Sequence, residues 1–168
     1  MRRLLLIGEY DLSIDEKGRL TIPSEIRKSL VPERDGEGFI VALGMNGRPW
    51  LYPEQVFEDL VFPDDDGTPG NEELDFAHAN YGLASRVAVD SQGRATNLEK
   101  MLRRTQTGRE VTLVGSRNHL EIWNRVDWEK RRDEELIPRI GEVAIRAKKA
   151  RQQEARMTPP PEASNGSR

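Results

Sequence analysis

The sequence contains no cysteine and only two histidines, His78 and His119. The missing thiols exclude a disulfide framework and zinc sites built on thiolates. Two isolated imidazoles leave few groups for acid–base catalysis or metal binding. A Gly-x-Ser-x-Gly elbow and a phosphate-binding glycine loop are also missing. We therefore predict that the protein is not an enzyme and that it carries no cofactor, catalytic residue or metal.

Long apolar runs are missing too. The run from Leu4 to Ile7 is too short for the core of a signal peptide, and no run approaches the ~20 apolar residues of a membrane span. Hydrophobic residues make up 36% of the 168 residues and charged residues 33%. The hydrophobic core must therefore contain few residues, and the surface must be polar. These features predict a cytoplasmic protein.

Positive charge is absent from residues 49–85. That stretch carries nine acidic residues, whereas the whole chain has a net charge of only −3. The other residues are therefore net positive, and such segregation steers a charged partner more than the total charge does. The negative net charge argues against a nucleic-acid partner, but the distribution of charge along the chain favours one.

One short motif occurs twice. Residues Asp15-Glu16-Lys17-Gly18-Arg19 and Asp90-Ser91-Gln92-Gly93-Arg94 both read Asp-x-x-Gly-Arg, and each copy follows a short alternating apolar segment. A glycine followed by two aromatic residues at the same spacing also recurs, as Gly44, Tyr52 and Phe57 and then as Gly115, Trp123 and Trp128. These repeats predict two diverged copies of one structural unit.

Each copy predicts two strands joined by a tight turn, in which the aspartate bonds the backbone and the glycine supplies a positive φ. In the first copy we expect strands over 7–14, 20–22, 39–43 and 50–52, a helix from an N-cap at Ser24 to Leu30, and a helix opened by Pro53. In the second copy we expect strands over 84–89, 94–97, 111–114 and 120–123, and a helix beginning near Leu98.

These elements divide the chain into five parts. We expect a first unit over 7–60, an acidic linker and helical connection over 61–80, a second unit over 81–128, a charged C-terminal helix over 129–157 interrupted at Pro138, and a disordered tail over 158–168.

The repeated residues resemble those of a known family. Gly8-Glu9-Tyr10, the segment from Asp15 to Arg27, the second Asp-x-x-Gly-Arg copy and the segment from Gly115 to Trp123 are similar to the MraZ family, which belongs to the AbrB-like swapped-hairpin superfamily. The resemblance covers about Ile7 to Trp128. It implies a mainly β fold with short helices, in which two tandem swapped hairpins form a pseudo-two-fold small β-barrel, followed by a C-terminal helix.

The resemblance also implies a function. MraZ-like proteins are nucleoid-associated transcriptional regulators of the division and cell-wall gene cluster. They assemble into ring-shaped homo-oligomers and bind G-rich direct repeats of double-stranded DNA upstream of a promoter. This chain departs from the family pattern at Asn97-Leu98, which replaces an apolar-Pro step, at Gln92, the neutral counterpart of Lys17, and in its long charged extension past Trp128.

The candidate DNA-binding residues are cations in or near the two motif copies. A two-stranded β-ribbon fits the major groove, where arginine can donate twice to guanine, whereas phosphate contacts suit cations in any orientation. The candidates are Lys17, Arg19, Arg27, Lys28, Arg86, Arg94 and Arg103.

Simpler interpretations exist for several of these residues. Arg19 and Arg94 alternatively serve only to pair with Asp15 and Asp90, and Arg27 and Lys28 alternatively form a solvated helix face. An alternative function is that of an AbrB-like antitoxin that binds a partner protein and its own promoter.

Overall fold

The computed structural model describes residues 3–61 and 71–157, and for residues 71–73 it describes the backbone alone. The chain separates into two compact units, residues 1–128 and residues 129–168. Residues 62–70 of the expected acidic linker and the whole expected tail lie outside the described residues.

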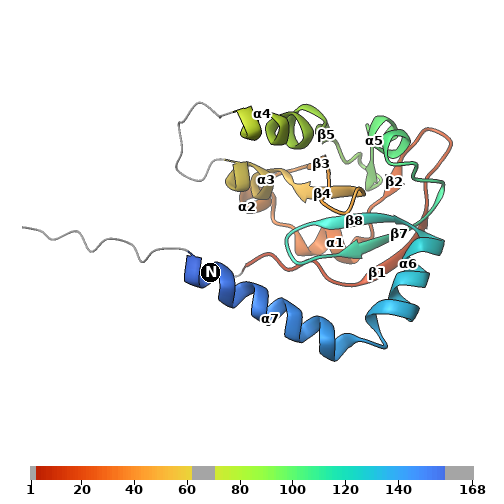
Figure 1. Cartoon of the computed structure of the whole chain (residues 1–168). Coiled ribbons are helices and arrows are strands. Elements are labelled where there is room, and N and C mark those ends of the chain that lie inside the picture. The colour runs from red at the N-terminus through yellow and green to blue at the C-terminus, as the bar shows by residue number, and fades with distance from the viewer. Residues whose placement is uncertain (1–2, 62–70, 158–168) are drawn as a thin grey trace, which may run out of the picture. The chain divides into compact units, whose positions relative to one another are not determined.

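The first unit contains both copies of the repeat (Figure 1). The first copy forms β1 (Glu9–Ser13), β2 (Leu20–Thr21), α1 (Ser24–Ser29), α2 (Pro32–Asp35), β3 (Phe39–Leu43), β4 (Pro49–Pro53) and α3 (Glu54–Val61). It is followed by α4 (Asn71–Ala77) and the π-helix η1 (His78–Gly82). The second copy forms β5 (Ser85–Val87), β6 (Arg94–Ala95), α5 (Glu99–Arg104), β7 (Glu110–Gly115), β8 (Leu120–Asn124) and α6 (Arg125–Lys130).

The strands of the two copies pair with one another. Among the described residues, six strands form an antiparallel sheet in the order β1-β7-β8-β4-β3-β5, and β2 pairs with β6 in a separate two-stranded sheet. Strand β1 of the first copy thus lies against β7 of the second, and β5 of the second copy lies against β3 of the first. This exchange confirms the predicted swapped-hairpin fold. Strands β1 and β5 form the edges of the larger sheet, so its hydrogen bonds do not close the predicted barrel.

Equivalent positions of the two copies meet in one hydrophobic core. Leu20 and Ala95 pair across β2 and β6 and are fully buried, and Ile26 of α1 and Met101 of α5 are each 3% exposed. Burying an apolar side chain of this size stabilises the fold by about 1.5–3 kcal/mol. The core therefore depends on both copies and belongs to neither alone.

The recurring aromatic residues lie mostly at the margin of this core. Trp123 is buried, but Tyr52, Phe57 and Trp128 are only partly covered. They pack in matching pairs, with ring centroids 5.5 Å apart for Tyr52 and Phe57 and 5.4 Å apart for Trp123 and Trp128. The regular spacing of the aromatics thus reflects two equivalent ring contacts between a strand and the helix after it.

Three local predictions were wrong in detail. Ser24 is the first residue of α1, because Pro23, in an extended conformation, occupies the N-cap without a side-chain hydrogen bond. Pro53 ends β4 in register with Phe39, so α3 begins at Glu54. The strand expected over 94–97 ends at Ala95, because Asn97 adopts a left-handed φ of 64° and its Nδ2 donates a hydrogen bond to the carbonyl of Arg86 at 2.8 Å.

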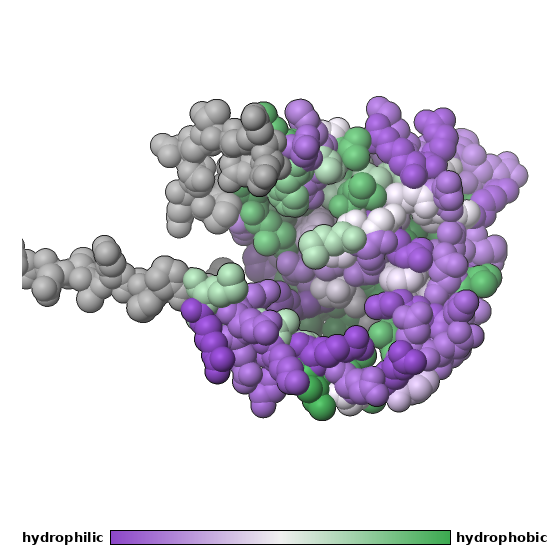
Figure 2. Space-filling model, viewed as in Figure 1, coloured by the Kyte–Doolittle hydropathy of each residue, from purple (hydrophilic) through white to green (hydrophobic). Residues whose placement is uncertain are grey.

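The described part of the second unit, residues 129–157, is mostly helical. The π-helix η2 (Arg131–Leu136) and α7 (Ile140–Met157) flank a turn that contains Pro138. This is the expected interruption, because proline cannot donate a helical hydrogen bond. No residue of α7 is buried, and Figure 2 shows hydrophilic residues along most of its visible face. Within the described ranges, no helix has the length and apolar character needed to cross a membrane.

Candidate nucleic-acid interface

The first motif copy folds into a loop organised by its aspartate. Oδ1 of Asp15 accepts hydrogen bonds from the backbone N–H groups of Lys17 and Arg19, each at 2.9 Å. The backbone N–H of Gly18 donates to the carbonyl of Asp15 at 3.0 Å, and Gly18 has a φ of 70°. An aspartate that begins a turn and a glycine with positive φ near its end are what the motif predicted.

The second copy repeats the same geometry. Oδ1 of Asp90 accepts from the backbone N–H groups of Gln92 and Arg94, again at 2.9 Å each. Gly93, with a φ of 78°, donates to the carbonyl of Asp90 at 2.9 Å. The replacement of lysine by Gln92 therefore leaves the loop unchanged, because that position contributes only its backbone to it.

In each loop the aspartate binds one edge of the arginine guanidinium. Nε of Arg19 lies 2.7 Å from Oδ2 of Asp15, and Nε of Arg94 lies 2.7 Å from Oδ2 of Asp90. The arginine side chains are 24% and 30% exposed, so neither points into the interior. Within residues 3–61 and 71–157, their Nη groups make no hydrogen bond. The predicted ion pairs therefore exist, and they leave the outer half of each guanidinium available to a ligand.

The same bonds lower the pKa values of Asp15 and Asp90. The largest cause is the hydrogen bond from the backbone N–H of Arg19 or Arg94, and the ion pair with that arginine side chain adds to it. Both carboxylates consequently stay ionised, and their arginines stay oriented, well below neutral pH.

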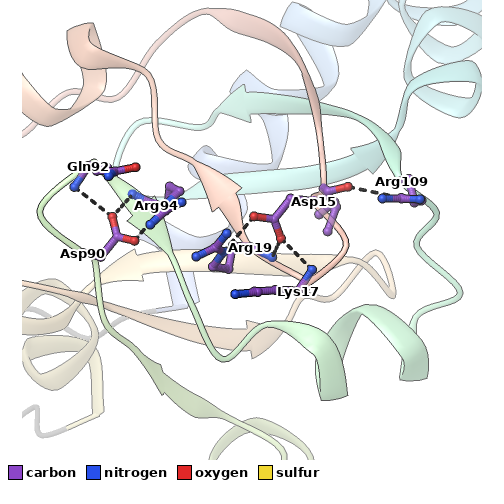
Figure 3. Close-up of polar contacts among 8 residues, drawn as sticks. Asp15, Lys17, Arg19, Asp90, Gln92, Arg94 and Arg109 are labelled. Carbon is purple, nitrogen blue, oxygen red and sulfur yellow. Dashed lines mark hydrogen bonds and ion pairs between the residues drawn. The ribbon is translucent and has the colours of Figure 1, made fainter.

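The two loops lie side by side. In the antiparallel pair of β2 and β6, Thr21 is opposite Arg94, and the backbone N–H of Ile22 donates to the carbonyl of Gly93 at 2.8 Å. In Figure 3 the guanidinium groups of Arg19 and Arg94 lie between the carboxylates of Asp15 and Asp90. We call residues 15–19 and 90–94 together the paired-loop surface.

Other predicted cations lie on or near this surface. Lys17 is exposed on the first loop, and Arg27 of α1 is exposed with its guanidinium over Gly93 of the second loop. Lys28 of α1 and Arg103 of α5 are also exposed, and within the described part of the chain neither side chain makes a hydrogen bond or ion pair.

Arg86 differs from the other candidates. It lies on the edge strand β5 and is 69% exposed. Its Nη1 lies 3.2 Å from Glu54 and its Nη2 lies 3.4 Å from Glu58, both on α3. Arg86 is therefore already neutralised by an acidic helix, which no local pattern in the sequence indicated.

One cation near the first loop was missed by the sequence analysis. Arg109 is exposed just before β7, and its Nε donates to the carbonyl of Ile14 at 3.4 Å (Figure 3). The backbone N–H of Ile14 donates in turn to the carbonyl of Arg109 at 2.8 Å. The proximity arises from the pairing of β1 with β7, so no spacing rule within one copy could have revealed it.

The histidines lie in ordinary structural surroundings. His119 is 7% exposed, stacks on Trp50 with centroids 4.1 Å apart, and has its Nδ1 2.9 Å from Oδ1 of Asn118. His78 lies in η1. Among the residues that the structure describes, no group of three or more His, Cys, Asp or Glu side chains could hold a metal ion.

The exchanged strands and the doubled aspartate–arginine loop define a tandem swapped-hairpin protein, in which one chain supplies both halves of a pseudo-dimer. Comparison with known proteins agrees. The family model described as "MraZ protein, putative antitoxin-like" matches residues 5–65 and 81–141. The chain belongs to the MraZ family.

Individual relatives cover most of the chain. The protein named transcriptional regulator MraZ from Clostridium tetani is 26% identical over 153 residues, which span 84% of this chain and 100% of the relative. Its namesake from Pediococcus pentosaceus is 33% identical over 128 residues, which span 75% of this chain and 85% of the relative. The protein of the same name from Lachnoclostridium phytofermentans is 31% identical over 126 residues, which span 74% of this chain and 85% of the relative.

Proposed function

We propose that the protein is a sequence-specific DNA-binding transcriptional regulator whose paired-loop surface enters the major groove. The observation that carries this proposal is the doubled, oriented arginine. Arg19 and Arg94 are each fixed through Nε by an aspartate while their Nη groups remain available. A planar guanidinium held in this way can donate to O6 and N7 of guanine with little further loss of side-chain entropy.

The neighbouring cations supply the sequence-independent part of binding. Lys17, Arg27, Lys28 and Arg103 are exposed and suit contacts with phosphate oxygens. Arg86 contributes least, because its ion pairs with Glu54 and Glu58 would have to be broken. The names of the relatives support a role in transcription.

The proposal extends to assembly and target. One chain offers a single paired-loop surface, whereas a ring-shaped homo-oligomer offers several in register with G-rich direct repeats. Linked contacts then reinforce one another through effective concentration. Such a protein would reside in the cytoplasm at the nucleoid and would control the division and cell-wall gene cluster from upstream of its promoter.

The test is retardation of the DNA upstream of the protein's own gene, compared with scrambled DNA of equal composition. Replacing both Arg19 and Arg94 with alanine should weaken specific binding at least about 30-fold, because each lost bidentate contact costs about 1–3 kcal/mol. Circular dichroism should stay unchanged, since an exposed ion pair contributes only about 0–1 kcal/mol to stability. Wild-type protein that binds both DNAs equally would refute the proposal.

A matched control removes the same charge elsewhere. Lys130 and Arg139 are exposed and lie outside the paired-loop surface, so their double replacement by alanine should change specific binding by less than about threefold. The slope of log affinity against log salt should be negative for the wild type and shallower for the Arg19 and Arg94 variant, because fewer counterions are released.

A second candidate function, that of an antitoxin, is favoured by the words "antitoxin-like" in the description of the matching family. It requires a partner protein whose toxicity the chain suppresses. Copurification of the full chain with a small protein whose expression alone arrests growth would support it, and co-expression that fails to relieve that arrest would refute it.

A further inference from the structure

The two loops of the paired-loop surface are alike in backbone but not in the side chain that covers them. We propose, building on the proposed DNA-binding function, that the second loop anchors the phosphate backbone through Arg27. The first loop, in contrast, discriminates between base pairs through Glu99, whose carboxylate accepts a hydrogen bond from the N4 amino group of a cytosine.

Glu99 covers the first loop. A Cβ atom added to Gly18 would lie 2.2 Å from Cγ of Glu99 and 3.0 Å from its Oε1, so the glutamate lies directly over the loop backbone. Glu99 is exposed and, in the described part of the chain, its side chain makes no hydrogen bond or ion pair. Its carboxylate is therefore free to accept a hydrogen bond beside Lys17 and Arg19.

Arg27 covers the second loop in the equivalent way. A Cβ atom on Gly93 would lie 2.6 Å from Cζ and 2.9 Å from Nη1 of Arg27. Its Nε donates to the carbonyl of Ile22 at 3.0 Å, which fixes the guanidinium on the loop. The two loops thus carry side chains of opposite charge at matched positions.

This difference follows from the exchange between copies. The loop of each copy packs against the helix of the other, α5 over the first loop and α1 over the second. Glu99 is the first residue of α5, and its counterpart in α1 is Ser24. The counterpart of Arg27 in α5 is Leu102, which lies in the core. The asymmetry is therefore a divergence between the copies and not a consequence of the fold.

The charges around the loops differ accordingly. In the first loop the positive Lys17, Arg19 and Arg109 are balanced by Asp15, Glu16 and Glu99. In the second loop Arg27 and Arg94 outweigh Asp90, which leaves one positive charge. Phosphate is attracted to the second loop more than to the first, where the Glu99 carboxylate would repel it.

A carboxylate in the major groove has one favourable use. The N4 amino group of cytosine is the hydrogen-bond donor that a G·C pair presents there, and Glu or Asp accepts from it, while arginine donates to the guanine. Glu99 and Arg19 on the first loop therefore provide an acceptor and a donor that together suit G·C pairs. A glutamate also rejects the carbonyl of thymine, which offers only an acceptor at the equivalent place.

The experiment compares Glu99→Gln and Arg27→Gln in the full-length chain, with the upstream DNA and scrambled DNA, at several salt concentrations. Glu99→Gln should tighten binding to scrambled DNA and lower the specific-to-scrambled affinity ratio at least about fivefold, the equivalent of losing about 1 kcal/mol of discrimination. Arg27→Gln should weaken binding to both DNAs by the same factor and reduce the salt slope by about 0.9.

Glu33→Gln is the matched control, because Glu33 is exposed on α2 and, within the described residues, makes no ion pair. It should leave the affinity ratio unchanged. Single replacements of G·C by A·T in the upstream DNA should reveal one pair whose replacement weakens the wild type but not Glu99→Gln.

An equal change on both DNAs for Glu99→Gln, or the absence of such a pair, would overturn the inference. Either result is distinct from failure of the proposed function, which requires that wild-type protein itself show no preference for the upstream DNA. Thermal unfolding of each variant separates these effects from loss of structure.

Discussion

Trp123 and Glu121 are joined by a hydrogen bond of 2.8 Å, from the indole Nε1 to Oε2, although the two residues lie on the same strand, β8. Residues two apart on a strand point to the same face of the sheet. Oε2 of Glu121 also accepts from Nδ2 of Asn46 at 3.0 Å, and Nε2 of His119 lies 3.3 Å from Oε1. One carboxylate thus ties the turn between β3 and β4 to β8.

This carboxylate should contribute measurably to stability. Burial, the strongest single influence, raises the pKa of Glu121, but the hydrogen bonds from His119, Trp123 and Asn46 together lower it. In Glu121→Gln an amide donor would face donor groups, so we expect the free energy of unfolding to fall by about 1–3 kcal/mol. Urea denaturation measures this, and the exposed Glu33→Gln should change it by less than about 0.5 kcal/mol.

Acid should unfold the protein partly through the two loops. Asp15 and Asp90 have lowered pKa values in the folded state, so their contribution is fully present above the unfolded value of about 3.9 and is lost as the pH falls through the folded values. The double variant Asp15→Asn, Asp90→Asn should be less stable at pH 7 and should lose less stability than the wild type between pH 5 and pH 3. Melting curves across this range test the prediction. Parallel curves for the two proteins would contradict it.

Gly115 should tolerate no side chain. A Cβ atom there would lie 2.6 Å from the backbone N of Ile7, and the backbone N–H of Gly115 donates to the carbonyl of Gly8 at 2.8 Å. Because backbone and not a flexible side chain is in the way, Gly115→Ala should destabilise the protein by about 1–3 kcal/mol. At Gly82 a Cβ atom would meet no heavy atom within 4 Å, so Gly82→Ala serves as the control. Similar losses of stability in both variants would show that the close approach does not matter.

The helices beyond residue 130 should be dispensable for folding. All members of the buried core cluster lie between Leu6 and Ile122, and Trp128 donates a hydrogen bond to Glu9 at 2.5 Å. A chain that ends after Lys130 should therefore keep a cooperative thermal transition within about 5 °C of the full chain, equivalent to about 1 kcal/mol or less. A noncooperative transition would show that the second unit completes the fold of the first.

Local chemistry accounts for what could be predicted from the sequence. The strand over Phe39–Leu43 was predicted with the bounds it has, because it is a continuous apolar run between turn residues. The two loops were predicted because an aspartate and a glycine at fixed spacing determine their hydrogen bonds. Asn97 could not be predicted to end its strand, since its left-handed conformation depends on a bond to Arg86 on another strand.

Contacts between the copies account for what could not be predicted. Arg109 reaches the first loop, Arg86 is neutralised by α3, and Glu99 covers Gly18 only because strands and loops are exchanged. A pattern read within one copy contains no information about these neighbours. The sequence therefore indicated which residues form the loops, while the charge around each loop became visible only in the structure.

The exchange of β1 also affects how the protein forms during synthesis. Glu9 pairs with Val114, so β1 is synthesised well before the strand β7 that completes its hydrogen-bonded ladder. Contacts between such distant residues slow folding and leave a strand edge exposed in the meantime. A nascent chain of this protein would therefore complete its sheet only when both copies have emerged, and until then β1 would present an unpaired strand edge.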